Sequence, residues 1–292
     1  MKSILKLLRP EQWIKNMFIF LPAFFNGHLW DINILFPCIV AFIAFSFAAS
    51  SIYCLNDIQD VESDRLHQKK CKRPIASGAI SIKTAYIVMT VCFIIFILVL
   101  FFFNEEKRYQ LIALIFVYYI MNLTYSFKLK QFAIIDVIII STGFVLRVLV
   151  GGVATGIWLS EWIIIMTFLL ALFLAFAKRR DDVILFQKTG ILPRKHTNRY
   201  NLEFLNQIIT IISTIVIIAY IMYALSPEVI SRFNNNYVYL TTIFVLVGII
   251  RYLQITIVDL KSGSPTEILL NDRFIQICIL GWIISFSFII YM

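Results

Sequence analysis

Three aspartates stand at intervals that suit a metal site. Asp57, Asp60 and Asp64 follow an uncharged apolar stretch at spacings of three and four residues. If a helix continues through them, all three carboxylates lie on one of its faces. Like charges stacked in this way repel each other unless a cation lies among them, and oxygen ligands favour Mg²⁺. The spacing therefore predicts a Mg²⁺ site for a diphosphate, with Asn56 as a further oxygen ligand.

Basic residues follow the aspartates closely. Arg73 opens the segment Arg73-Pro74-Ile75-Ala76-Ser77-Gly78, whose composition is typical of a turn that presents a phosphate-binding arginine. A second interpretation remains open, in which the aspartates form a solvated acidic helix end that pairs with Arg65, Lys69 and Lys70. The two interpretations differ in whether the acidic residues bind a metal ion.

A second charged cluster, Lys178-Arg179-Arg180-Asp181-Asp182, follows the sixth apolar stretch. Helical spacing pairs Lys178 and Arg179 with Asp182. In the functional interpretation the cluster is a second polar wall facing the first, where Lys178 and Arg179 bind anionic oxygens and Asp182 helps a second metal ion. In the other interpretation it is a basic stop-transfer segment that fixes topology, which fits Arg180 equally well.

Three charged residues interrupt otherwise apolar stretches. Lys15, Asp136 and Arg147 are costly in a membrane unless they face a cavity or a partner, so each is a candidate for function. Asp136 alternatively forms an interfacial salt bridge with Lys130 or Lys128. Arg147 lies about three helical turns beyond Asp136, on the same face, and is too far along the helix to pair with it.

The elements that must position these residues are membrane helices. The chain has 292 residues, 60% hydrophobic and 15% charged, and its mean hydropathy is +0.86. Soluble domains hold about 45–50% apolar residues, so a soluble or disordered protein is excluded. A span needs about 20 apolar residues. The nine predicted spans are Trp13–Trp30, Ile32–Asn56, Thr84–Asn104, Tyr109–Phe127, Phe132–Gly152, Trp162–Ala177, Phe204–Pro227, Phe233–Ile250 and Phe274–Met292.

The net charge of +9 follows this topology. With the N-terminus in the cytoplasm, 22 of the 26 lysines and arginines fall on the cytoplasmic side, as the positive-inside rule requires. The charge is thus explained without a nucleic-acid partner, and we expect none. Residues 1–292 are predicted to form one all-α transmembrane domain, a bundle of nine helices whose active site lies in cytoplasmic loops at about residues 56–81 and 178–206.

These residues resemble those of the UbiA superfamily of intramembrane prenyltransferases, whose members have nine helices and an Asn-Asp-x-x-Asp-x-x-x-Asp motif after the second helix. The similarity covers nearly the whole chain, and within the superfamily it is greatest to the decaprenyl-phosphate phosphoribosyltransferase branch. The residues that carry this closer similarity are Arg9-Pro10-x-Gln12-Trp13-x-Lys15-Asn16, Asn56-Asp57, Asp60, Asp64-Arg65-x-His67, Lys70, Arg73-Pro74-x-Ala76-x-Gly78, Tyr125-Ser126, Leu129-Lys130, Asp136, Gly143-Phe144 and Arg147.

One segment departs from ordinary prenyltransferases. Those proteins usually carry a second Asp-x-x-x-Asp-like motif after the sixth helix, whereas this chain has the basic cluster that begins at Lys178. Such a basic motif is similar to the phosphoribosyl branch, whose donor is phosphoribosyl pyrophosphate and whose acceptor is a polyprenyl phosphate. Two substrates that each bring extra phosphate would need additional cations.

The resemblance implies Mg²⁺-dependent transfer of 5-phosphoribose from phosphoribosyl pyrophosphate to a membrane polyprenyl (decaprenyl) phosphate, with release of pyrophosphate at the cytoplasmic face of a bacterial inner membrane. Asp57, Asp60 and Asp64 would hold the metal and, with Asp182, form the catalytic set. The candidate substrate-binding residues are Lys15, Asn16, Asn56, Arg65, Lys70, Arg73, Lys130, Asp136, Arg147, Lys178 and Arg179. The sequence leaves homo-oligomer formation open.

Two alternatives stay open. In the first, a polyprenyl diphosphate alkylates an aromatic acceptor such as 4-hydroxybenzoate, and Asp136 or Asp182 assists the cationic intermediate. In the second, the protein is a transporter or carrier that binds anionic lipid head groups and turns nothing over. Only the two enzyme hypotheses predict pyrophosphate release.

Overall fold

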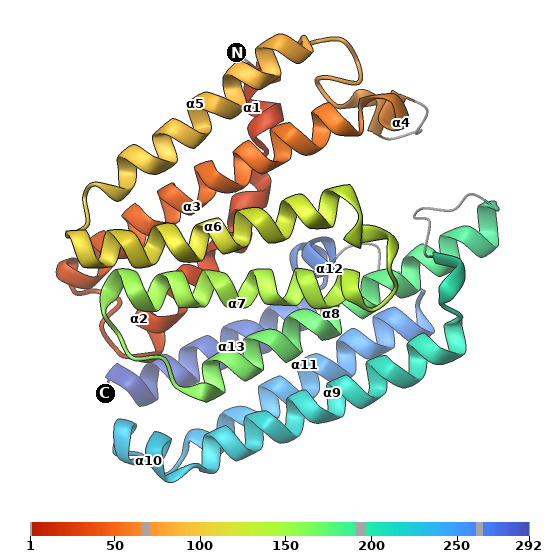
Figure 1. Ribbon diagram of the computed structural model, residues 1–292. Coiled ribbons are helices and arrows are strands. Elements are labelled where there is room, and N and C mark those ends of the chain that lie inside the picture. Colours follow the sequence, from red (N-terminus) through yellow and green to blue (C-terminus); the bar gives the residue numbers. More distant parts are fainter. Residues whose placement is uncertain (1, 66–69, 191–196, 261–264, 292) are drawn as a thin grey trace. The chain divides into compact units, whose positions relative to one another are not determined.

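The computed structural model describes residues 2–65, 70–190, 197–260 and 265–291, and every regular element in these ranges is a helix (Figure 1). Eight helical segments are long and apolar enough to cross a membrane, which confirms the all-α membrane class. They are α3 (Ile32–Gln59), α5 (Ile82–Leu100), α6 (Glu105–Phe127), α7 (Ile135–Thr155), α8 (Glu161–Thr189), α9 (Leu202–Leu225), the segment Val238–Val258 and α13 (Arg273–Tyr291).

The remaining helices are short. They are α1 (Lys2–Leu8), η1 (Pro10–Phe20), α2 (Leu21–Phe25), α4 (Val61–Arg65), η2 (Lys70–Lys72), η3 (Leu129–Gln131), η4 (Thr197–Arg199), α10 (Pro227–Phe233) and α12 (Pro265–Asn271). The chain divides into two compact units. The first unit comprises residues 1–128 and 143–159, and the second comprises residues 129–142 and 160–292, so α7 contributes to both.

In the first unit, α3 packs along α5 and also contacts α6 (Figure 1). Asp31 caps the start of α3 by accepting a hydrogen bond from the amide of Asn33. The buried side of α3 is rich in small residues, including Ala41, Ala44 and Ala48, and these let neighbouring helices approach closely. The long α3 therefore forms a rigid support whose last turn carries Asn56 and Asp57.

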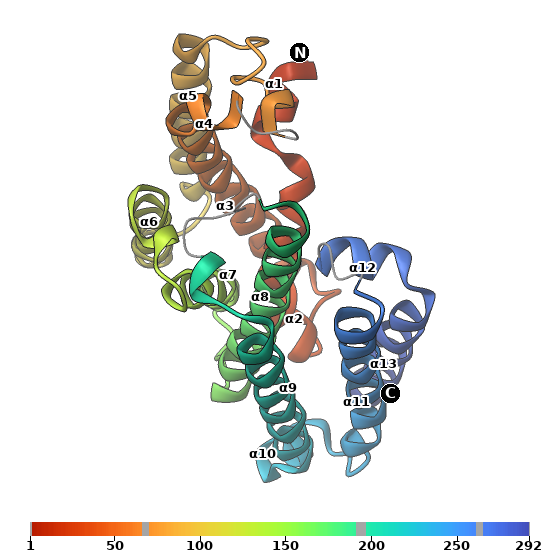
Figure 2. The same ribbon diagram turned by 90° about the vertical axis from the view of Figure 1, so that its right-hand side faces the viewer.

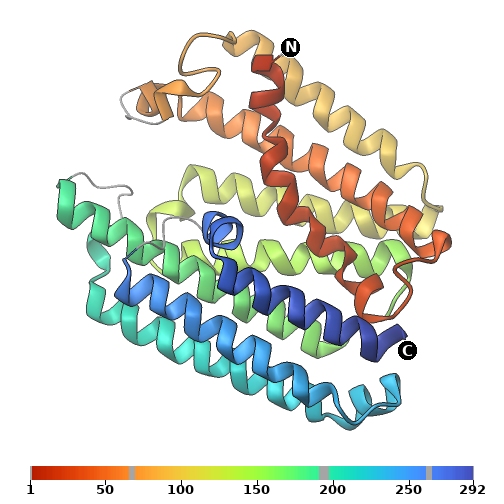
Figure 3. The ribbon, with the colours of Figure 1, turned by 180° about the vertical axis from the view of Figure 1, so that it is seen from behind.

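The predicted first span, Trp13–Trp30, is wound differently from the others. Residues 10–20 form the 3₁₀ helix η1, which continues into α2 and runs beside α3 (Figure 3). Such long 3₁₀ segments are uncommon. The indole of Trp13 donates a hydrogen bond to Ser50, and the Asn16 amide donates one to Ser46. A three-residue step on η1 thus matches a four-residue step on α3. The nine-span count stays a prediction at this segment.

Gly151 lets η1 lie against α7. A Cβ atom built at Gly151 would lie 2.1 Å from the Ile19 carbonyl oxygen, which is a backbone atom and cannot rotate aside. We expect Gly151→Ala to destabilise the protein by about 1–3 kcal/mol, as overpacked cores do, and to lower the thermal unfolding midpoint in detergent. Gly143→Ala on the same helix is the control, because its nearest neighbours lie at 3.5–3.6 Å. Equal midpoints for the two variants would contradict this packing.

In the second unit, α8 packs along α9, and α11 (Thr242–Leu253) packs along α13 (Figure 2). The last turn of the span that ends at Val258 is a π-helix, η6 (Gln254–Val258). Helix α8 continues to Thr189, where Gly190 ends it in the left-handed conformation. The cluster Lys178–Asp182 therefore lies within a helix, whereas a loop was predicted from residue 178.

An ion pair joins α11 to the residue before α13. Arg251 Nη2 donates to Asp272 Oδ2 at 2.7 Å, and this hydrogen bond holds the pKa of Asp272 below its ordinary value. A pKa lowered in the folded state stabilises the protein above the ordinary aspartate value of about 4, and the stabilisation is lost as the pH falls through the lowered value.

The thermal midpoint of the wild type should therefore exceed that of Asp272→Asn near neutral pH, and the difference should shrink below about pH 4. Because the pair is partly exposed, its contribution to stability should be small. Unfolding curves of both proteins in one detergent across this pH range would test it. A difference that stays constant with pH would contradict the assignment.

Candidate active site

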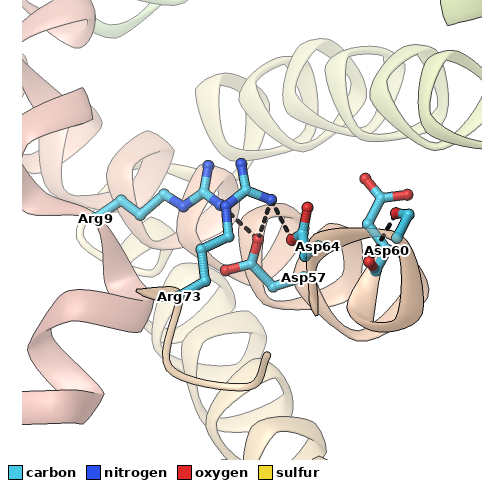
Figure 4. A network of polar contacts seen from close by, with 6 residues as sticks. Arg9, Asp57, Asp60, Asp64 and Arg73 are labelled. Carbon is cyan, nitrogen blue, oxygen red and sulfur yellow. Dashed lines mark hydrogen bonds and ion pairs between the residues drawn. The ribbon is translucent and has the colours of Figure 1, made fainter. Parts of the chain in front are cut away.

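Two buried carboxylates share two arginines at the end of α3. Arg9 Nη2 donates to Asp57 Oδ1 at 2.5 Å, and Arg73 Nη1 donates to Asp57 Oδ1 at 3.1 Å and to Asp64 Oδ2 at 2.6 Å (Figure 4). The side chains of Asp57 and Asp64 are 1% and 2% exposed, whereas those of Arg9 and Arg73 are 21% and 27% exposed. The carboxylates of this cluster are therefore buried, whereas its two guanidinium groups are partly accessible to solvent.

Local backbone geometry brings the arginines to the carboxylates. Arg9 has φ 53° and ψ 58°, a left-handed conformation that few residues other than glycine adopt, and it precedes Pro10 at the start of η1. Arg73 begins a compact turn in which the Ser77 amide donates to the Arg73 carbonyl. Gly78, with φ 76°, allows the chain to leave that turn. The predicted turn around Arg73 is thus present, and its arginine contacts the acidic residues.

Asp60 lies apart from this network. Helix α3 ends at Gln59, Asp60 follows it as the cap residue, and α4 begins at Val61. Figure 4 places Asp60 farther from the two arginines than Asp57 and Asp64. Within the described ranges no three His, Cys, Asp or Glu side chains are grouped so that they could hold a metal ion. The break after α3 explains why the three aspartates do not line one continuous helical face.

Two oxygens beside the network fit a divalent cation. Among the described residues, Asn56 Oδ1 and Asp57 Oδ2 are buried and lack a hydrogen-bond partner. Leaving such acceptors unsatisfied is costly, and amide and carboxylate oxygens are ligands that Mg²⁺ accepts. The residues present therefore fit Mg²⁺, with Asn56 and Asp57 as the nearest candidate ligands and Asp64 beside them.

Other predicted site residues lie on the neighbouring elements α4, η2 and η1. Arg65 is exposed on α4, and its Nε donates to the Ala76 carbonyl at 3.4 Å. Lys70 is half-buried in η2, and Lys15 is half-buried on η1. His67 and Lys69 lie outside the described residues.

Arg147 lies in a buried cage in the first unit. Its Nε donates to Asn16 Oδ1 at 2.8 Å, Nη1 donates to the Gly143 carbonyl at 2.6 Å, and Nη2 donates to the Tyr118 hydroxyl at 3.1 Å. Its guanidinium also lies 4.8 Å from the Phe45 ring centroid. These contacts join η1, α3, α6 and α7. Arg147 therefore holds Asn16 in place, and with it the helix η1, which Arg9 precedes.

The second unit has its own polar cluster, on α7 and α8. Arg179 Nε donates to Asp136 Oδ2 at 2.6 Å, and its Nη1 donates to Asp182 Oδ2 at 2.5 Å. The predicted Arg179–Asp182 pair is therefore present. The Tyr200 hydroxyl donates a long hydrogen bond to Asp136 at 3.5 Å and accepts one from the Ile134 amide at 2.6 Å. Burial raises the pKa of Tyr200 to about 12, so its hydroxyl stays protonated.

The rest of the cluster divides by exposure. Lys178 is exposed and Asp182 is half-buried on α8, and Lys130 is half-buried in η3. Arg180 is buried, where its Nε donates to Asn206 and its Nη1 donates to the Thr256 carbonyl of η6. These bonds join α8, α9 and η6, so Arg180 has a structural role beyond the predicted topological one.

Sequence reasoning did not assign Arg9, Tyr118 or Tyr200 to the site. Arg9 was present only in the resemblance motif, and its partner lies 48 residues away in sequence. One available signal was the need of a buried intramembrane charge such as Arg147 for polar and aromatic partners. That requirement points to Asn16 and to the tyrosines of apolar stretches, although it does not select among them.

Comparisons with known proteins agree with the fold and the motifs. The model of the UbiA prenyltransferase family matches residues 17–274. The decaprenyl-phosphate phosphoribosyltransferase of Corynebacterium glutamicum is 32% identical over 99% of this chain and 87% of its own length. That of Mycolicibacterium smegmatis is 33% identical over 99% of this chain and 92% of its own length.

Solved structures show the same fold. A UbiA homolog from Archaeoglobus fulgidus, solved with DMAPP and Mg²⁺ bound, matches 99% of this chain and 98% of its own with a TM-score of 0.70 at 19% identity. The family match extends over most of the described helices and includes Asn56, Asp57 and Asp64. These findings confirm the resemblance drawn from the motifs. The chain belongs to the UbiA prenyltransferase family.

Proposed function

We propose that this protein transfers 5-phosphoribose from phosphoribosyl pyrophosphate to a polyprenyl phosphate in the membrane and releases pyrophosphate. The observation that carries the proposal is the cluster in which Asp57 and Asp64 lie against Arg9 and Arg73. It offers carboxylates for a metal ion and cations for phosphate oxygens in one place. The names of the full-length relatives support phosphoribosyl pyrophosphate as donor and a polyprenyl phosphate as acceptor.

The chain's own residues would bind the leaving group. Asn56 and Asp57, with Asp64 and Asp60 nearby, would hold Mg²⁺, which when bound neutralises charge on the diphosphate. Arg73, Arg65 and Lys70 would bind donor phosphate oxygens, and Arg9 is added to this set because its guanidinium reaches Asp57. Charge stabilisation by positioned cations is a large catalytic term in reactions of this kind.

The acceptor needs little activation. A lipid phosphate is already anionic, so the protein has no need of a general base and can act by positioning and charge stabilisation. As the C1–O bond to pyrophosphate breaks, the ribose C1 gains positive charge and a lipid phosphate oxygen attacks from the opposite face. The configuration at C1 should therefore invert. Lys15 is proposed to bind the lipid phosphate, and Arg147, through its bond to Asn16, is proposed to position η1.

The basic residues in the cluster Lys178–Asp182 of α8 support a donor that carries several phosphate groups. Lys178 is exposed there and is the candidate for a substrate phosphate. Arg179 is bound by Asp136 and Asp182. We therefore propose that Asp182 holds Arg179, in place of the predicted role at a second metal ion. The basic residues also favour a cytoplasmic location for this end of the helices, in a bacterial inner membrane.

The test is pyrophosphate release by purified protein in detergent with Mg²⁺ and a polyprenyl phosphate. We expect release that requires both phosphoribosyl pyrophosphate and the lipid. The matched reaction contains a polyprenyl diphosphate and 4-hydroxybenzoate. Release only in the second reaction would establish ordinary prenyl transfer, and release in neither would favour a lipid carrier.

A further inference from the structure

The acidic residues of the first unit already have cationic partners. Asp57 and Asp64 are almost fully buried, and together they carry two negative charges that Arg9 and Arg73 balance. Buried carboxylates without such partners would repel each other and pay a large desolvation cost. The two arginines therefore take the place that a divalent cation would have in a site of this composition.

A cation that binds Asp57 competes with the two arginines for this carboxylate. Asn56 Oδ1 and Asp57 Oδ2 are buried to solvent, and Asp57 Oδ1 accepts hydrogen bonds from both arginines. The arginines themselves are partly exposed, so their guanidinium groups can turn outward. Arg9 also lies over the Tyr53 ring, 5.3 Å from its centroid, which offers the guanidinium a favourable surface during such a movement.

Electrostatics then distinguish a bare metal ion from a metal diphosphate. A bare Mg²⁺ that displaced the arginines would leave two guanidinium charges unpaired beside a divalent ion. A diphosphate bound with the metal supplies oxygens for both guanidinium groups, and arginine matches phosphate oxygens well. In this exchange the carboxylates would gain the metal ion in place of the arginines, and the guanidinium groups would gain phosphate oxygens in place of the carboxylates. No charge is then left without a partner.

We propose that Arg9 and Arg73 are internal counter-ions of Asp57 and Asp64 that Mg²⁺ and a diphosphate displace together, so that the metal binds weakly alone. This inference rests on the proposed function for the identity of the diphosphate as leaving group. It assigns Arg9 a role beyond holding η1 against α3. It also explains how a buried acidic site stays folded when no metal is bound.

Binding of Mn²⁺, followed by electron paramagnetic resonance on the full-length protein in detergent, tests this exchange. Dissociation constants are measured with and without inorganic pyrophosphate at matched free Mn²⁺ concentrations. For the wild type we expect pyrophosphate to tighten Mn²⁺ binding by at least about tenfold, within the usual range of coupling between sites. Equal affinities with and without pyrophosphate would overturn the proposal.

The sign of the mutational effect separates a counter-ion from a structural salt bridge. Arg9→Asn removes the cation while retaining a residue that tolerates the left-handed backbone of Arg9. We expect it to tighten Mn²⁺ binding in the absence of pyrophosphate by about tenfold, since a competing charged hydrogen bond is lost, and to weaken pyrophosphate binding. Arg73→Gln should act in the same direction and replaces Arg9→Asn if that variant does not fold.

Lys6→Gln is the matched control, because Lys6 is an exposed lysine on α1 that precedes Arg9 by three residues. It removes one positive charge and should leave both dissociation constants nearly unchanged. Weaker Mn²⁺ binding alone in the two arginine variants would show that the arginines hold the carboxylates in place, and would overturn the proposal.

These measurements are independent of the donor and acceptor. If pyrophosphate release from phosphoribosyl pyrophosphate is absent while the coupling and its mutational signs are found, the proposed function fails and the counter-ion exchange stands. If release is found while Mn²⁺ binds equally well alone, the exchange fails and the proposed function stands.

Discussion

Turnover should fall by about a thousandfold or more when Asp57 is replaced by Asn, because the variant loses charge at a residue that contacts both arginines and offers an unsatisfied oxygen. The substitution keeps the shape of the side chain and its position at the end of α3. Pyrophosphate release at saturating lipid, measured for several donor concentrations, would separate a loss of kcat from a rise in KM.

The neighbouring acidic residues provide the comparison. Glu62 is exposed on α4 and lies outside the arginine network, so Glu62→Gln should retain wild-type turnover. Asp64→Asn should be impaired more than Asp60→Asn, because Asp64 is bound to Arg73 and Asp60 lies apart. An Asp57→Asn variant with near wild-type turnover would contradict the assignment of Asp57 to the metal site. If Asp60→Asn instead loses more turnover than Asp57→Asn, the single helical face predicted from the spacing would be supported.

Asp136→Ala should destabilise the second unit by up to about 3–5 kcal/mol, the usual cost of breaking a buried ion pair by removing one partner, because Arg179 keeps only the partly exposed Asp182. Arg179 is 1% exposed and Asp136 is fully buried, so the guanidinium cannot recover the lost interaction from water. Among the described residues Arg179 Nη2 already lacks a hydrogen-bond partner, which makes a second loss more costly. Thermal or denaturant unfolding in detergent would measure the effect.

Two further variants define its cause. Asp182→Ala removes the other carboxylate that binds Arg179, but Asp182 is 18% exposed, so the cost should be smaller. The double variant Asp136→Ala, Arg179→Met removes both charges of the buried pair and should recover part of the stability. If the double variant is no more stable than Asp136→Ala, the ion pair is not the source of the loss.

Much of the fold could be predicted from where charged residues are absent. Stretches such as Thr84–Asn104 and Phe204–Pro227 contain no charge over the length of a span, and the structure has α5 and α9 there. Local spacing also succeeded for Arg179 and Asp182, since an i, i+3 contact within one helix depends on that helix alone. Predictions of this kind need no knowledge of which helices are neighbours.

The partners of Arg9 and Arg147 could not be predicted in this way. Arg9 contacts Asp57 across 48 residues, and Arg147 contacts Asn16 across 131 residues. Both contacts depend on how η1 packs against α3 and α7, which no local pattern encodes. The face shared by Asp57, Asp60 and Asp64 was predicted on the assumption of one continuous helix. The helix instead breaks at Asp60, and Arg73 binds Asp57 and Asp64 on either side of the break.

The 3₁₀ winding of η1 also decides how far the N-terminal segment can reach. A 3₁₀ helix rises about 2.0 Å per residue, whereas an α-helix rises about 1.5 Å. The 11 residues of η1 and the 5 residues of α2 therefore extend roughly 30 Å along their axes, which is close to the hydrocarbon thickness of a bilayer. A regular α-helix needs about 20 residues for that distance. Because of its 3₁₀ geometry, the 16-residue segment of η1 and α2 thus has about the length of a membrane-spanning helix, and Arg9 lies at its N-terminal end.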